Sequence, residues 1–316
     1  MGWLTDPLSL ELFQRALIAA VVMGATCGAI GAYVVLRRLA FIGDALSHAV
    51  FPGVVLAYVG GFPIFVGAMA AGALTSLAIA IVSRGQRIRE DTAIGIFFAG
   101  AFALGIVLIS TQTGYQRDLG AFLVGDLLGV SWGQIAASAV SGALVIGLLV
   151  ALRKELLLAS FDRVYAQALG YPVFALELLL LLLLTATIVV SLSAVGIILV
   201  LAMLVTPAAT ARLLVDRFTP MMITGAGLGA LYGVVGWYAS FYLAWSPGGA
   251  IVLTATLAFV IAFVLSPSHG MLAHRLRRHP QHGALRPAID PPAGHDHGPR
   301  EDRVVASVER RHPPGR

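Results

Sequence analysis

The sequence predicts an all-α, polytopic membrane protein with about eight to nine transmembrane helices. Two observations support this fold class. Of the 316 residues, 58% are hydrophobic and 12% are charged, whereas soluble domains have about 45–50% and about 25%. Apolar runs of about 17–25 residues, the length that crosses a bilayer as a helix, also recur along the chain as far as Leu265.

Nine apolar stretches are candidate spans. In chain order they lie near residues 16–36, 41–59, 62–82, 93–110, 135–152, 173–192, 195–214, 221–243 and 250–265. The second stretch is the weakest, because Asp44, His48 and Pro52 interrupt it and favour a broken or partly re-entrant helix. If this stretch does not cross, the count falls to about eight spans.

Positive charge is concentrated in the connections that follow every second span. The clusters are Arg37 and Arg38; Arg84, Arg87 and Arg89; Arg153 and Lys154; Arg212 and Arg217; and Arg275, Arg277 and Arg278. This pattern predicts that these connections are cytoplasmic, with the N-terminus outside and the C-terminus inside. The net charge of +5 is therefore attributed to topology and lipid contact, and no nucleic-acid partner is expected.

Small residues recur at a spacing of four in two of the spans. Gly24 and Gly28 lie in the first, and Gly225, Gly229 and Gly233 lie in the eighth. Such spacing lets membrane helices approach closely, because nothing projects from the glycine face. Tight packing within one subunit is favoured over a subunit interface.

Asp44 and His48 are the polar pair around which the second span is organised. Four residues are about one helical turn, so both side chains leave the same face of a helix. A carboxylate and an imidazole are suitable ligands for a transition metal, and both are costly to bury without a partner. The residues alone leave two readings open, namely metal contact or a structural role. In the structural role the two side chains hydrogen-bond to neighbouring helices or end a helix near the membrane interface. Ser47 is expected to bond to the backbone.

The connection at residues 154–172, KELLLASFDRVYAQALGYP, is too long for a simple turn. It predicts a short amphipathic helix on the cytoplasmic side, with Phe161, Ala166 and Leu169 among polar neighbours and Gly170 closing it. A helix there needs a surface to pack on. It lies either in the lipid headgroup region or against a soluble partner.

Three acidic residues are expected to have structural roles. Glu177 lies one turn into an apolar run and is expected near the cytoplasmic interface or paired inside the bundle. Glu90 and Asp91 begin a predicted helix, where negative charge is favourable.

The chain is expected to have two parts, a membrane domain at residues 1–268 and a tail at residues 269–316. The tail is rich in Pro, Arg and His, and seven of the eight histidines lie in it. It has too few large apolar groups to bury a core, so it is predicted to be a disordered cytoplasmic tail. The single cysteine excludes a disulfide framework.

No enzymatic activity is expected of the chain itself. It contains neither a GxxxxGK[ST] nucleotide loop nor an HExxH metalloprotease motif. Residues 129–133, GVSWG, satisfy the GxSxG hydrolase pattern, but Ser131 opens a membrane helix and is interpreted as its N-cap.

In combination, three segments resemble the membrane subunit of the ABC-type zinc, manganese and iron importers. They are GDALSHAVFPGV at residues 43–54, the 154–172 segment, and VVSLSAVGIILVLAMLVTPAATARLL at residues 189–214. The resemblance runs from about residue 13 to about residue 270. It implies a permease in the cell membrane that translocates a divalent zinc, manganese or iron ion as substrate, with no permanently bound cofactor. It also implies three partners: a cytoplasmic ATPase, an extracytoplasmic metal-binding protein and a second permease copy.

The same resemblance implies roles for six residues. Asp44 and His48 match the metal-gating acid and histidine that line the pathway of the homodimer. The coupling helix at about 154–170, which docks in a cleft of the ATPase, is matched by Phe161, Asp162, Ala166 and Gly170.

Two other classes of function remain as alternatives. A secondary metal transporter would relay protons through Asp44 and His48 and work without an ATPase. An intramembrane hydrolase would use Ser131 or Asp44, and it is disfavoured because the catalytic partners are missing.

Overall fold

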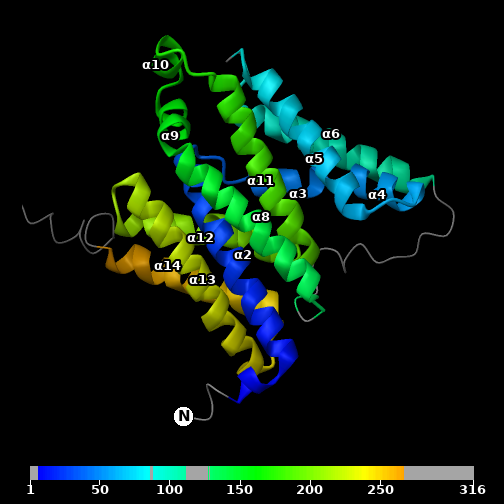
Figure 1. Ribbon diagram of the computed structural model, residues 1–316, viewed down its shortest axis with the longest axis vertical. Helices are drawn as coiled ribbons and strands as arrows, with labels where there is room; N and C mark the ends of the chain where they lie inside the picture. Colours follow the sequence, from blue (N-terminus) through cyan, green and yellow to red (C-terminus); the bar gives the residue numbers. More distant parts are fainter. Residues whose placement is uncertain (1–5, 86–87, 112–126, 128, 267–316) are drawn as a thin grey trace, which may run out of the picture. The chain divides into compact units, whose positions relative to one another are not determined.

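The computed structural model describes residues 6–85, 88–111, 127 and 129–266, all within one compact unit, Met1–Arg277. Over these residues the chain forms helices and no strand (Figure 1). In chain order the elements are the 3₁₀ turn η1 (Pro7–Ser9) and the helices α2 (Glu11–Leu36), α3 (Ile42–Ala49), α4 (Phe51–Gly60), α5 (Ile64–Ser83), α6 (Glu90–Ser110), α8 (Trp132–Ala151), α9 (Arg153–Phe161), α10 (Arg163–Ala168), α11 (Val173–Val195), α12 (Ile197–Leu214), α13 (Phe218–Leu243) and α14 (Pro247–Leu265).

Nine helical segments among the described residues are long and apolar enough to cross a membrane, with α3 and α4 counted together as Ile42–Gly60. Each overlaps one of the predicted stretches, so the all-α polytopic fold is confirmed. The two remaining helices, α9 and α10, form the connection that was predicted to hold a short helix. The chain is therefore a multi-pass membrane protein.

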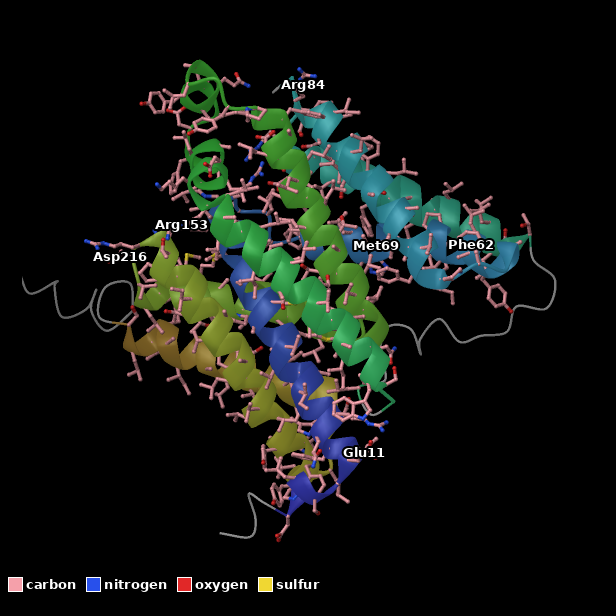
Figure 2. The ribbon with its side chains drawn as sticks, viewed as in Figure 1. Glu11, Phe62, Met69, Arg84, Arg153 and Asp216 are labelled. Atoms are coloured by element: carbon pink, nitrogen blue, oxygen red, sulfur yellow. The ribbon has the colours of Figure 1, made fainter. Side chains whose placement is uncertain are left out.

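Some expectations lie outside the described residues. They concern the tail at 269–316 and the arginines Arg87, Arg275, Arg277 and Arg278. Figure 2 shows Arg84 and Arg153, from two of the positive connections, at the ends of their helices that lie away from Glu11. This arrangement agrees with the alternating charge pattern, while the side of the membrane on which each end lies stays a prediction.

The second span is broken, as its polar residues and proline predicted. Helix α3 ends at Ala49 and α4 begins at Phe51, with Val50 between them. Pro52 lies in the first turn of α4, where it has no N–H to donate to the carbonyl of His48 one turn earlier. The break therefore falls directly after the Asp44–His48 turn.

The predicted glycine packing occurs within one chain, between α2 and α13. A Cβ added to Gly28 would lie 2.1 Å from the carbonyl oxygen of Gly225, and one added to Gly24 would lie 2.3 Å from that of Gly229. The two backbones are thus in direct contact at both levels. Helices from opposite ends of the sequence cross here, with α12 also packed on α2 (Figure 1).

Helix α8 begins with a capping box. The Ser131 hydroxyl accepts the Gln134 backbone N–H at 3.2 Å, and the Ser131 N–H donates to the Gln134 side chain at 2.9 Å. The interpretation of Ser131 as an N-cap is confirmed, because its hydroxyl accepts a backbone N–H in the first turn of α8 that has no partner within the helix.

Candidate functional site

The structure places Asp44 and His48 on the same face of α3, as their spacing predicted. The Nε2 atom of His48 lies 3.4 Å from Oδ1 of Asp44, and the side chains are 23% and 44% exposed respectively. The Ser47 hydroxyl instead donates to the Gly43 carbonyl at 2.8 Å, as expected of a backbone-bonding serine. One carboxylate and one imidazole therefore reach the surface of the isolated chain side by side.

Two aromatic rings of α6 flank His48. The imidazole centroid lies 5.1 Å from the ring of Phe102, edge to face, and 5.6 Å from that of Phe98. Phe51, at the start of α4, also contacts Phe102, at 5.8 Å. These rings restrict the imidazole and leave its Nε2 edge towards Asp44. Sequence reasoning missed them, although Phe98 and Phe102 share the one-turn spacing of the polar pair.

The Asp44–His48 pair offers two side chains that could bind a metal ion. Across the described ranges, no group of three or more His, Cys, Asp or Glu side chains is close enough to hold a metal ion. Transition metals in proteins take at least about four ligands. A transition metal bound at this pair would therefore need donors beyond the two that the described part of one chain offers.

The segment predicted as one short helix consists of two, which corrects the expectation. Helix α9 ends at Phe161, and α10 begins at Arg163. Asp162 between them has extended dihedrals, φ −140° and ψ 92°, and its Oδ1 accepts the Tyr165 N–H at 2.8 Å. Asp162 acts as the N-cap of α10, and this cap is the reason that the helix is interrupted.

Gly170 closes α10 with a Schellman motif. The Tyr171 N–H donates to the Ala166 carbonyl at 3.1 Å, and the Gly170 N–H donates to that of Gln167 at 2.9 Å. Gly170 has a φ of +82°, which favours glycine at this position. Ala166 is fully buried, so it packs inside the chain instead of facing a partner.

The outward face of this segment is apolar. Large side chains with more than half of their area exposed are Phe161, Val164, Tyr165 and Leu169, which we call the docking surface. Val164 and Tyr165 were not singled out in the sequence, because their exposure depends on the direction in which α10 leaves Asp162. A contiguous exposed apolar group at a loop is typical of an interaction site.

Four alternating charges link this segment to the membrane helices. Arg163 of α10 pairs with Glu177 of α11, Glu177 lies 3.8 Å from Arg37, and Arg37 donates to Glu90 at 2.8 Å. The Glu177 and Arg37 side chains are 7% and 10% exposed. We call these residues the four-charge network. The expected pairing of Glu177 is confirmed, and Glu90 lies in the first turn of α6, as predicted.

The chain is similar to known membrane transport proteins over most of its length. It is 44% identical over 270 residues to the manganese transport system membrane protein MntC of Halalkalibacterium halodurans, covering 85% of this chain and 92% of that one. It is 38% identical over 282 residues to the chelated iron transport system membrane protein YfeC of Yersinia pestis, covering 88% and 96%.

A solved structure has the same fold. The structure of PsaBC from Streptococcus pneumoniae in complex with Fab superposes with a TM-score of 0.75 and 36% identity, covering 87% of this chain and 99% of that chain. Residues 9–266, which include every membrane helix described above, match the ABC 3 transport family. This chain belongs to the ABC 3 transport family.

Proposed function

We propose that this chain is the permease subunit of an ATP-driven importer for a divalent transition metal, with manganese or iron as the substrate. The observation that carries the proposal is the Asp44–His48 pair, two metal-binding side chains 3.4 Å apart on a membrane-spanning segment. The relatives described as manganese and chelated iron transport proteins support the choice of metals. Zinc, which suits the same ligand types, is the third candidate.

The pair works as a gate between two copies of the chain. One copy supplies one carboxylate and one imidazole, so a homodimer with the pairs facing each other supplies four donors. Mixed oxygen and nitrogen donors suit manganese and iron as well as zinc. The ion is held at the gate by charge and ligation, and it passes when the two α3 segments separate.

The energy comes from a separate ATPase bound at the docking surface. The chain has no nucleotide-binding loop of its own, and Phe161, Val164, Tyr165 and Leu169 present apolar area to a partner. Closure of two ATPases moves the docking surface, and an extracytoplasmic metal-binding protein delivers the ion to the opposite side. A proton-coupled transporter without an ATPase is disfavoured by membership of an ABC transport family.

The test is uptake of radioactive manganese by proteoliposomes that contain the permease, its ATPase and its binding protein. Asp44→Asn and His48→Ala are expected to lower uptake by at least about tenfold, because each removes a metal donor. Complex assembly and basal ATP hydrolysis should stay intact, since both residues lie on α3 and neither belongs to α9 or α10.

The matched control is Ser47→Ala, which lies between the two donors but bonds to the backbone of Gly43. It is expected to transport at the wild-type rate. Wild-type uptake in both donor variants would remove Asp44 and His48 from the pathway. Competition by unlabelled iron and zinc ranks the three metals as substrates.

A further inference from the structure

The four-charge network lies between the docking segment, by which we mean helices α9 and α10, and the elements around the Asp44–His48 gate. Arg163 is the first residue of α10, and Glu177 lies on α11. Arg37 caps the C-terminus of α2, and Glu90 is the first residue of α6. The network therefore joins the consecutive helices α10 and α11 to α2 and α6, which lie much earlier in the chain. Helix α10 begins next to Asp162, at the base of the docking surface.

Arg37 is coupled stiffly to α3. The turn after α2 is a Schellman motif in which the Leu39 N–H donates to the Val34 carbonyl at 2.9 Å and the Arg38 N–H donates to that of Val35 at 3.2 Å. Arg38 occupies the left-handed position with a φ of 61°. Helix α3 follows at Ile42, which is fully buried. When Arg37 moves, this tight turn is therefore expected to move α3 as well, and Asp44 with it.

Glu90 is coupled to the other side of the gate. It begins α6, the helix whose Phe98 and Phe102 rings contact His48. The Arg37–Glu90 hydrogen bond thus ties the C-terminal cap of α2, which leads into α3, to the first residue of α6, the helix that the His48 imidazole contacts. While this bond is intact, the first turn of α6 stays close to the turn that leads into α3.

The weakest contact of the network lies between its two halves. Arg163 with Glu177, and Arg37 with Glu90, are each hydrogen-bonded, whereas Arg37 and Glu177 are 3.8 Å apart. Opening this middle contact leaves two neutral ion pairs and no uncompensated buried charge. Separation is therefore much less costly there than at either outer pair, where it would leave a buried charge alone.

The structure also contains space on both sides of Arg163. An open pocket of about 340 Å³ is lined by Arg84, Arg163, Phe174 and Glu177, and another of about 290 Å³ is lined by Arg37, Leu39, Glu90 and Arg163. Arg163 borders both pockets, so its side chain can change direction without displacing packed core. The surroundings permit two arrangements of the network.

We propose that the four-charge network is the joint through which movement of the docking segment opens and closes the Asp44–His48 gate. Its residues are positioning residues: Arg163 and Glu177 move with the ATPase, and Arg37 and Glu90 hold α3 and α6. The inference rests on the proposed function and adds the connection between its two sites. Pairs at an exposed surface contribute little, but here the two central side chains are at most 10% exposed.

The test measures the number of ATP molecules hydrolysed per manganese ion taken up, in proteoliposomes with the complete complex. Arg163→Met keeps the docking surface but removes the charge that pairs with Glu177. We expect the ATP-to-manganese ratio to rise by at least about fivefold, with ATPase binding unchanged. Arg163→Lys, which keeps the charge without the planar guanidinium, is expected to restore part of the coupling.

The matched control is Arg153→Met, because Arg153 at the start of α9 donates to the Thr219 hydroxyl at 3.1 Å and lies outside the network. Its ratio should equal that of the wild type. A wild-type ratio in Arg163→Met, together with lost uptake in Asp44→Asn, would overturn the joint while leaving the gate. Absence of uptake in the wild-type complex would instead overturn the proposed function.

A second measurement tests whether the two ends of the network act together. Glu90→Gln perturbs the network from its far end, and it is combined with Arg163→Met in a double-mutant cycle. If both act through one joint, the ratio in the double variant is expected to match that of the more affected single variant. If the double variant instead raises the ATP-to-manganese ratio by the product of the two single effects, the two residues act independently, which would contradict the proposal.

Discussion

Individual side chains distinguish between the two readings of Asp44 and His48. Hydrogen bonding to neighbouring helices would require partners on other elements. In the described part of the chain, the polar contact of each is the other, and the neighbours from α6 are the rings of Phe98 and Phe102. Asp44 keeps 44% of its side chain exposed. An acid that its own chain leaves this exposed on a candidate membrane-spanning segment favours a ligand role.

A substitution of the single residue Val164 tests the docking surface. It is 70% exposed, and Val164→Asp would place a charge inside the proposed contact with the ATPase. We expect the affinity for the ATPase to fall by at least about tenfold, or about 1.4 kcal/mol, as measured by binding of purified ATPase to the permease in detergent.

The control for this prediction is Val164→Ile, which keeps an apolar side chain and should bind normally. Because Val164 does not contribute to the buried core, both variants are expected to have the melting temperature of the wild type. Normal ATPase binding by Val164→Asp would contradict the assignment of Val164 to the ATPase contact.

At the scale of helices, the crossing of α2 and α13 is one of the places where two backbones leave no room for a side chain. The carbonyl of Gly225 lies where a Cβ on Gly28 would project, at 2.1 Å, so the neighbour is rigid backbone. Gly28→Ala is expected to destabilise the protein by about 1–3 kcal/mol, seen as a lower melting temperature in detergent. Gly227→Ala is the matched control, because no atom lies within 4 Å of its added Cβ. Equal melting temperatures would contradict this packing.

The membrane helices were predictable because each depends on a continuous apolar run, a local property of the sequence. The break after Ala49 was predictable for the same reason, since Pro52 acts on its own helix. The division of the docking segment at Asp162 was missed, because the same residue pattern fits one amphipathic helix until the cap bond to Tyr165 is known.

Contacts between distant segments are the part that the sequence could not supply. That Gly28 meets Gly225, or that Arg37 meets both Glu90 and Glu177, depends on how helices pair in space. The spacing of glycines indicates that a close partner exists but does not identify it. The charges of the network likewise looked like separate helix-end residues until the fold brought them together.

At the scale of the whole molecule, the proposed metal pathway makes the number of donors depend on how many copies share it. One chain brings Asp44 and His48, and the described residues hold no cluster of three or more metal-binding side chains. A pathway between two copies would complete a site of four donors, whereas a pathway through each copy would leave the ion with two. These arrangements differ in how one damaged copy affects the assembly.

A mixed complex separates the two arrangements. One wild-type copy and one copy with both Asp44→Asn and His48→Ala are given different affinity tags, and complexes that contain both are purified in sequence. If four donors hold one ion, uptake of manganese should be below about a tenth of the wild-type rate, close to that of the fully substituted complex. Independent pathways would instead give uptake midway between the two matched complexes, because separate sites act additively. A mixed complex with Ser47→Ala in one copy controls for tagging and assembly, since Ser47 bonds to its own helix.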